Sequence, residues 1–198
     1  MKKLIGLLLI ACLMIACGSS RQVSRVAADS TIDLSGRWND TDSRLVSQEV
    51  VSDCLARPWV NEFNIAQSRK PAVIVGTIRN KSNEHIDTET FTKDFERELI
   101  NSGKVKFVAS KIERDEIRDE RDDQQDNSSD ETAKRLAMET GADFMLQGSI
   151  KTIVDQIEGR RVIYYQTDME LVNIESNEKV WLGGKKIKKD IKQKGKKW

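Results

Sequence analysis

The chain has 198 residues and a formal net charge of +1 at pH 7, with 38% hydrophobic and 33% charged residues. This length fits one domain with or without a tail, and the composition permits a core beneath a largely ionic surface. One histidine excludes most zinc and imidazole-base chemistry, and three cysteines are too few for a disulfide framework. The balanced charge also disfavours a nucleic-acid-binding protein.

The N-terminus has the pattern of an export signal. Lys2 and Lys3 precede an apolar run over residues 4–16. At about 1.5 Å per residue the run spans ~20 Å, less than the ~30 Å hydrocarbon core of a bilayer. Ala16 then precedes Cys17, as in bacterial lipoprotein signals. We predict a signal peptide over residues 1–16 and a lipidated thiol at Cys17, with Gly18 favouring release to the outer membrane.

Two alternatives to this cleavage site exist. Cleavage before Cys12 would leave the apolar residues 13–16 exposed beside the lipid, so cleavage before Cys17 is favoured. A plain cleaved signal or an uncleaved anchor is the second alternative. Removal of residues 1–16 takes away two lysines and leaves a net charge of −1. Cys54 is then the one free thiol, and its apolar neighbours predict a buried side chain rather than a nucleophile.

Residues 17–36 are predicted to be the lipidated cysteine and a flexible tether, because small and polar residues show no period there. We expect the globular domain over residues 37–190. Its first helix begins at the capping residues 39–41 and continues through apolar residues at helical spacing. Pro58 opens a second short helix, which places Trp59, Phe63 and Ala66 on one face.

A strand, a helix and a second strand follow. Residues 72–78 are apolar and β-branched, which predicts a strand buried on both faces, and a polar loop is expected over residues 79–87. The helix over about residues 88–102 carries Phe91, Phe95 and Leu99 on one face and ends at Gly103. With a strand at residues 105–109, this order predicts a right-handed crossover between parallel strands.

The second half predicts an antiparallel meander. Residues 113–131 form an acidic run, typical of a solvated helix face, and a further helix is expected from Ser128 to Gly141. Strands are expected from residue 144, over residues 162–174 with alternating apolar and polar positions, and at residues 180–182. The fold class is therefore α/β: a single domain with a small mixed β-sheet, parallel plus antiparallel, flanked by helices.

The loop after the first strand is the first candidate site. It holds Arg79, Lys81 and His85 before a helix N-terminus, which can attract an anion. It lacks a phosphate-binding glycine motif, and His85 lacks the companion ligands that zinc needs. A plain strand-to-helix connection is the simpler interpretation. No nucleophile elbow or EF-hand spacing occurs, so we expect no enzyme activity, no cofactor and no metal.

The lysine-rich C-terminus is the second candidate. Lys185, Lys186, Lys188 and Lys189 begin a dense basic stretch that could bind an anionic glycan, lipid headgroups or an acidic partner. The alternative is a frayed tail, assigned here to residues 191–198, in which Trp198 could stack on a sugar. Tyr164, on the polar face of the alternating strand, and Trp181 are aromatic candidates for a partner surface unless a helix covers them.

Several segments taken together resemble the penicillin-binding protein activator family LpoB. They are residues 39–46, 57–59, 70–82, 141–148 and 178–181, and the likeness spans about residues 36–190 together with the lipoprotein start. The resemblance implies a fold related to the N-terminal domain of TolB. It also implies a non-enzymatic outer-membrane lipoprotein, facing the periplasm, that binds a bifunctional peptidoglycan synthase and stimulates cell-wall synthesis.

Residues 18–36 are too short to cross the periplasm. Either the synthase extends toward this domain, or the lipid lies in the inner membrane, or the partner is a different protein. The alternative function is an envelope scaffold or glycan-binding lipoprotein without a synthase-activating role. Among the candidate partner-binding residues are Arg79, Lys81 and His85 in the loop, Tyr164, and the lysines at 185, 186, 188 and 189.

Overall fold

The computed structural model describes residues 22–126 and 141–193. The chain divides into two units, Met1–Ser30 and Thr31–Trp198. In the described part of the first unit, the amide of Ser30 donates to the carbonyl of Ala27 and closes a turn. The predicted signal peptide, Cys17, the helix expected after residue 128 and the last five residues lie outside the described residues.

The second unit is built on a six-stranded sheet, whose strands are β1 (Ala72–Lys81), β2 (Lys106–Phe107), β3 (Phe144–Ile157), β4 (Arg160–Asn173), β5 (Lys179–Gly183) and β6 (Lys186–Lys192). The order is β2-β1-β3-β4-β5, and β6 pairs with the first half of β4. β1 runs parallel to β2 and β3, whereas β4 runs antiparallel to β3, β5 and β6. The predicted mixed α/β sheet is confirmed.

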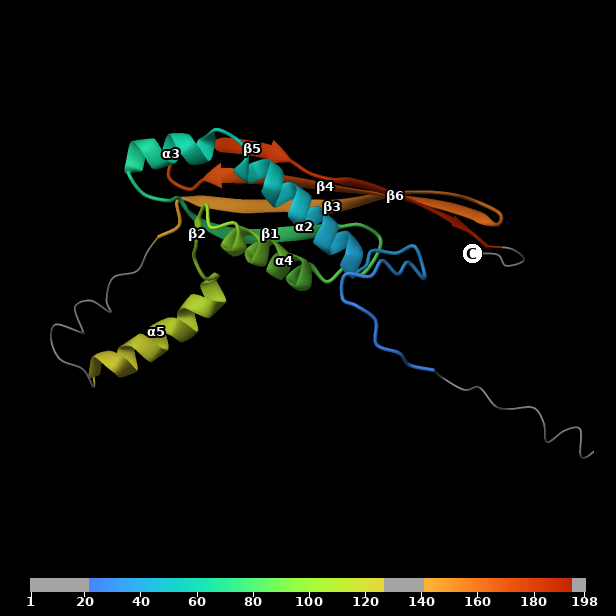
Figure 1. The fold of residues 1–198 in the computed structure, drawn as a ribbon, viewed down its shortest axis with the longest axis horizontal. Coiled ribbons are helices and arrows are strands. Elements are labelled where there is room, and N and C mark those ends of the chain that lie inside the picture. Colours follow the sequence, from blue (N-terminus) through green and yellow to red (C-terminus); the bar gives the residue numbers. More distant parts are fainter. Residues whose placement is uncertain (1–21, 127–140, 194–198) are drawn as a thin grey trace, which may run out of the picture. The chain divides into compact units, whose positions relative to one another are not determined.

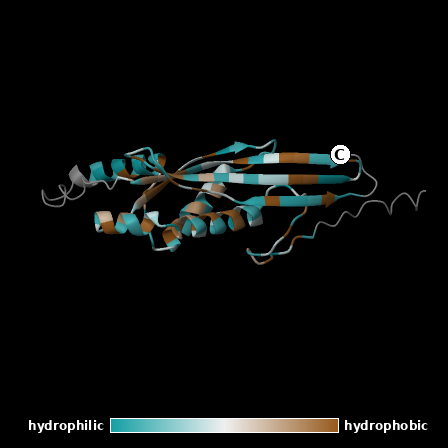
Figure 2. Cartoon of the chain, turned by 90° about the horizontal axis from the view of Figure 1, so that it is seen from above, coloured by the Kyte–Doolittle hydropathy of each residue, from teal (hydrophilic) through white to brown (hydrophobic). Residues whose placement is uncertain are grey.

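Four helices are described: α2 (Asp40–Leu55), α3 (Trp59–Gln67), α4 (Thr88–Asn101) and α5 (Lys111–Asp126). α2 and α4 contact each other and the strands, and they lie on the same face of the sheet (Figures 1 and 2). Asn39 caps α2 in a reciprocal capping box with Asp42, and the Asp87 carboxylate accepts from two amides of α4. Local sequence therefore fixes where both packed helices begin.

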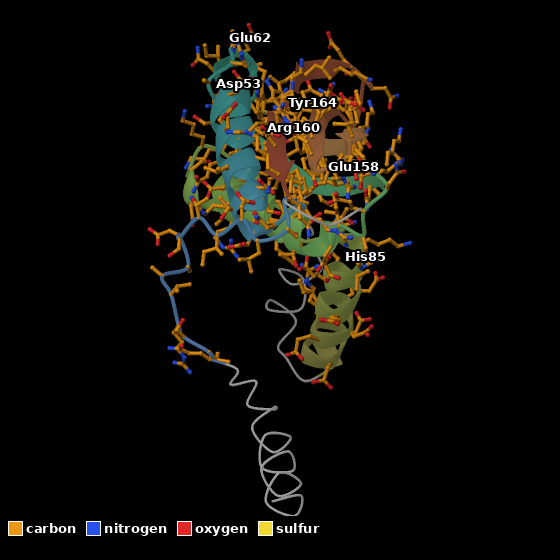
Figure 3. The ribbon with its side chains drawn as sticks, turned by 90° about the vertical axis from the view of Figure 1, so that its right-hand side faces the viewer. Asp53, Glu62, His85, Glu158, Arg160 and Tyr164 are labelled. Atoms are coloured by element: carbon orange, nitrogen blue, oxygen red, sulfur yellow. The ribbon has the colours of Figure 1, made fainter. Side chains whose placement is uncertain are left out.

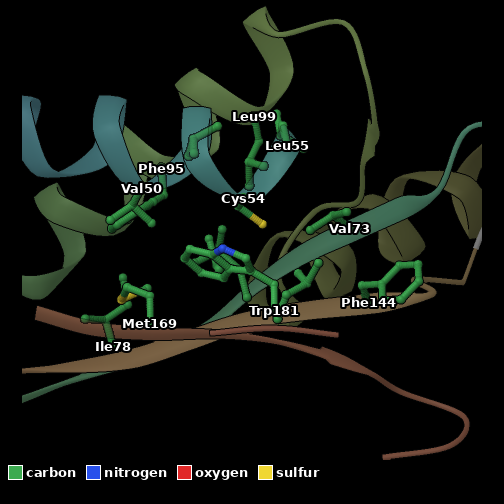
Figure 4. Close-up of a cluster of buried hydrophobic side chains, with 14 of the residues drawn as sticks. Val50, Cys54, Leu55, Val73, Ile78, Phe95, Leu99, Phe144, Met169 and Trp181 are labelled. Atoms are coloured by element: carbon green, nitrogen blue, oxygen red, sulfur yellow. The ribbon is translucent and has the colours of Figure 1, made fainter. Parts of the chain in front are cut away.

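The core lies between these helices and the sheet (Figure 4). Phe91, Phe95 and Leu99, which the sequence places on one face of α4, are all buried. Cys54 is 2% exposed, and burial raises the pKa of its thiol to about 12, which confirms a packing role. Trp181 is also buried. Its indole nitrogen donates to the Asp53 carboxylate of α2 at 2.9 Å, so this aromatic is covered by a helix.

Four expectations for the strands were wrong. β1 continues to Lys81, so Arg79 and Lys81 belong to a strand and not to a loop, because β3 is long enough to pair with them. Thr77 is exposed, so the strand is buried on both faces only over its first residues. β2 is reduced to two residues.

The fourth error concerns the C-terminus. β5 is not the last strand, because residues 186–192 form β6. Of the tail predicted over residues 191–198, Ile191 and Lys192 belong to this strand. In β6, Ile187, Lys189 and Ile191 alternate with more exposed residues. The described part of the acidic run, by contrast, lies in helix α5 with mostly exposed side chains, as expected for a solvated helix.

Candidate functional site

The face of the sheet opposite α2 and α4 is the candidate interaction surface, and we call it the outer face. Along β4, buried Ile163, Tyr165 and Met169 point toward the helices, as the sequence alternation predicts. Their neighbours Tyr164 and Gln166 point the other way. Residues that pair directly with these two in β3 and β6 share the outer face.

A row of polar residues crosses the outer face, and we call it the central row. Lys81 of β1 pairs with Lys151 of β3, which pairs with Gln166 of β4, which pairs with Lys186 of β6. The side chains of Lys81 and Lys186 form no hydrogen bond or ion pair with any other residue in the described ranges. The central row therefore presents ammonium groups that are available to a partner.

Acidic residues next to the central row are already paired. The Asp168 carboxylate accepts from Gln166 at 2.7 Å and from Lys151 at 2.8 Å, and these bonds lower its pKa. The Glu170 carboxylate pairs with Lys179 at 2.6 Å, and this bond, with a smaller contribution from the charge of Arg79, lowers its pKa. Arg79 thus lies on the same outer face, in register with Ser149.

Tyr164 lies in a shallow hollow toward the end of the sheet where β3 turns into β4. Its register partners are Ile153 and Lys188. The hollow has a volume of about 810 Å³ and is lined by Ile153, Asp155, Arg160, Val162, Tyr164, Gln166, Lys188 and Asp190. Figure 3 shows Tyr164 and Arg160 at this end of the sheet.

The predicted lysines of the C-terminus divide between the two faces of the sheet. Lys186 and Lys188 are exposed on the outer face. Lys189 points to the helix side, where its Nζ lies 2.6 Å from both Asp33 and Asp42. Lys185 forms an ion pair with Glu49 of α2. Lys185 and Lys189 are therefore engaged within the domain.

His85 is not brought to the outer face. It is an exposed residue of the loop between β1 and α4, and Figure 3 shows it apart from Tyr164 and Arg160. This loop contacts the rest of the domain through Glu84. The Glu84 carboxylate accepts hydrogen bonds from the Tyr165 hydroxyl at 2.8 Å and from the Trp38 amide at 3.2 Å. Burial, followed by this bond to Glu84, raises the pKa of Tyr165.

Lys151, Gln166 and Ile153 are outer-face residues that the sequence did not single out as candidates. β3 was expected to begin at residue 144 with no predicted end, and it continues to Ile157. In residues 22–126 and 141–193, no three His, Cys, Asp or Glu side chains are grouped so that they could hold a metal ion. The same residues contain no helix with the length and apolar content needed to span a membrane.

Comparison with known proteins places the chain in a family. The family described as peptidoglycan-synthase activator LpoB matches residues 42–187. The LpoB C-terminal domain from Salmonella enterica is 18% identical with a TM-score of 0.40, and the match covers 77% of this chain and 99% of that domain.

The corresponding domain from Escherichia coli is 18% identical with a TM-score of 0.44, over 74% of this chain and 98% of that domain. The NMR structure of E. coli LpoB is 15% identical with a TM-score of 0.43, over 90% and 85% of the two chains. No curated protein matches the chain significantly. Because the family match spans well over half of the sequence, this protein belongs to the peptidoglycan-synthase activator LpoB family.

Proposed function

We propose that this protein is a lipid-anchored regulator that binds a bifunctional peptidoglycan synthase, a penicillin-binding protein, and activates it. The observation that carries the proposal is the family match over residues 42–187. The lipid is attached to Cys17, in the outer membrane with the domain facing the periplasm. The protein contributes binding energy and no chemistry of its own. Activation then requires that it bind the active state of the synthase more tightly than the inactive state.

We propose the central row as the part of the outer face that binds the synthase. Lys81 and Lys186 form no hydrogen bond or ion pair among the described residues, although the charge of Lys186 acts on Asp168, and Arg79 adds a third cation on the same face. This arrangement fits a partner surface rich in carboxylates, because complementary charge raises the association rate and selects the partner. Tyr164, half-buried beside the row, would supply the aromatic contact.

The other candidate residues have different proposed roles. Lys185 forms an ion pair with Glu49, and Lys189 forms ion pairs with Asp33 and Asp42. We therefore propose that these two lysines hold β6 against α2 and do not contact the synthase. His85 lies in the loop that Glu84 ties to Tyr165. We propose that it lies at the margin of the interface, where its substitution has little effect.

Titration of the purified lipidated protein onto its synthase tests this surface. The double variant Lys81→Glu with Lys186→Glu places like charges against an acidic partner and is expected to weaken binding at least about tenfold. Lys111→Glu, an exposed lysine at the start of α5, is the matched control and should bind as the wild type does. Equal affinities of the double variant and the control would contradict the assigned surface. Absence of wild-type binding would contradict the proposed function.

A further inference from the structure

The hairpin formed by β3 and β4 carries exposed apolar side chains near its turn. Ile157 is 74% exposed and Ile153 is 67% exposed, and both pair with outer-face residues of β4, Arg160 and Tyr164. Val154, on the other face, is 39% exposed. Figure 1 shows that the hairpin extends beyond α2 and α4, so these helices do not cover its end. We call Ile153, Ile157 and the cations beside them the hairpin end.

Cations of β4 and β6 lie on one side of these isoleucines, and Asp155 lies between the two isoleucines on the same face. Lys188 and Lys192 of β6 pair in register with Tyr164 and Arg160 and are exposed on the outer face. The charged groups of the turn and outer face at this end are Arg160, Lys186, Lys188 and Lys192, against Asp155, Glu158 and Asp190. Cations are in excess by one, although Arg160 pairs with Asp190 at 2.9 Å and Lys192 lies 4.0 Å from the same carboxylate. Isolated apolar side chains among cations are typical of surfaces that bind at the boundary of an anionic bilayer.

The chain enters the domain at this same end. Asp33 is held by the ammonium of Lys189 at 2.6 Å. Gly36 lies so close to β6 that a Cβ on it would overlap the side chain of Ile191. Ile191 pairs with Arg161, next to the turn at Gly159. Residues 33–36, at the start of the second unit, are therefore fixed beside the hairpin.

The length of the chain before Asp33 limits how far the hairpin end can lie from a lipid on Cys17. Sixteen positions separate Cys17 from Asp33. A flexible chain of this length has a root-mean-square span of about 22 Å, and a fully extended one reaches about 55 Å. An anchor at Cys17 therefore keeps the hairpin end at high local concentration against the bilayer, where even weak contacts are occupied.

We infer that the hairpin end is a membrane-contact site for anionic phospholipid. Ile153 and Ile157 enter the headgroup boundary of the bilayer, and Lys188, Lys192 and Arg160 lie against headgroup phosphates. The inference rests on the lipid anchor of the proposed function and is independent of synthase activation. It also gives the domain one orientation, in which the central row stays farther from the bilayer than the hairpin turn.

The test uses the full-length lipidated protein with an environment-sensitive fluorophore on Glu158→Cys, in the exposed turn of the hairpin. Cys54 is buried and does not compete for the label. The protein is reconstituted in vesicles of phosphatidylcholine with phosphatidylglycerol, or of phosphatidylcholine alone, each containing quencher-bearing lipid. We expect quenching in the anionic vesicles that high salt reverses. A label on Glu175→Cys, in the turn between β4 and β5, should not be quenched.

Two pairs of variants separate the contributions. Lys188→Glu with Lys192→Glu should lower the ratio of docked to undocked hairpins at least about twenty-fold, since each lysine near an anionic surface contributes about fivefold. Lys106→Glu, on β2, is the matched control. Ile153→Ser with Ile157→Ser should also reduce quenching, whereas Leu182→Ser, 70% exposed on β5, should not.

Flotation of the wild-type protein with the vesicles verifies the anchor, and its failure would contradict both the anchor and the inference. If the anchored protein showed no quenching at residue 158, the membrane contact would be refuted while synthase activation stood. Quenching that was equal in both vesicle types would refute the anionic specificity. The label could instead quench itself more strongly as more protein is bound per vesicle, with no quenching by lipid. That result would refute the membrane contact and show that the hairpin end binds a second copy of the chain.

Discussion

The ammonium of Lys189 lies 2.6 Å from the carboxylate of Asp42, although 147 positions separate them in the sequence. The same Nζ contacts Asp33 at 2.6 Å and donates to the Arg37 carbonyl at 3.0 Å. Burial opposes the charge of Lys189, but the bonds to Asp33 and Asp42 outweigh it and raise the pKa of the lysine. One side chain thus joins β6, the start of α2 and the segment that precedes it.

Substitution of Lys189 with Met should destabilise the domain by about 3 kcal/mol, because it leaves Asp42 buried without its cation. The side chains of Lys189 and Asp42 are 10% and 6% exposed. Lys188→Met, one residue earlier on the exposed outer face, should change stability by no more than about 0.5 kcal/mol. Urea unfolding measures both values. Equal losses in the two variants would show that the Lys189 pair has no special role.

The two adjacent tyrosines of β4 provide a second matched comparison. Tyr165 is fully buried and its hydroxyl donates to Glu84 at 2.8 Å, whereas Tyr164 is half-buried on the outer face. Tyr165→Phe should cost about 2 kcal/mol of unfolding free energy, since a hydrogen bond to a carboxylate is lost in a dry site. Tyr164→Phe should be nearly neutral. Thermal unfolding of the two variants would contradict this account if it ranked them in the opposite order.

The sequence was sufficient to predict those helices and strands in which apolar residues recur at regular spacing. Phe91, Phe95 and Leu99 mark α4 because their spacing alone defines a helix face. β4 was predicted because buried and exposed residues alternate along it. β6 was missed because lysines occupy both its exposed and its half-buried positions, so its sequence shows no clear alternation of apolar and polar residues. Nothing in the sequence distinguishes Lys189, which points inward and pairs with Asp42, from the exposed lysines beside it.

The candidate site was less predictable than the fold. Arg79 and Lys81 were identified as candidates, but their place on β1 depends on pairing with a β3 strand that lies far along the chain. Lys151 was missed since its neighbours in the sequence give no sign of the residues that face it across the sheet. Which lysines stay available was decided by tertiary ion pairs, as Lys185 and Lys186 show.

Glu113 should titrate far below an ordinary glutamate. Lys93 at 2.6 Å, and then the Ser110 amide at 2.8 Å, lower its pKa from 4.5 to about 2. A lowered pKa means that this carboxylate stabilises the fold above about pH 4.5 and loses that effect as the pH falls toward 2. Carboxyl NMR shifts followed against pH measure the midpoint.

Lys93→Ala should raise that midpoint toward 4.5, because it removes the largest cause of the shift. Lys111→Ala, nearby at the first position of α5, should leave it unchanged. A midpoint near 4.5 in the wild-type protein would show that α5 is not held to α4 through Lys93 in solution.

Gly148 should not tolerate a side chain. A Cβ there would overlap the Asp168 carbonyl oxygen and the sulfur of Met169 on β4, so β3 and β4 would have to separate. Gly148→Ala is expected to cost about 2 kcal/mol, in the range for overpacked sites. At Gly141 an added Cβ meets nothing within 4 Å, and Gly141→Ala is the control. Chemical denaturation that found the two variants equally stable would refute the tight contact between β3 and β4.

The most direct measurement of the central claim is the rate of glycan polymerisation by the cognate synthase as the purified lipoprotein is added. The account predicts that the rate rises and saturates with binding, and that Lys81→Glu with Lys186→Glu shifts the rise to higher concentration without lowering the plateau. An unchanged rate at saturating, independently confirmed binding would contradict it.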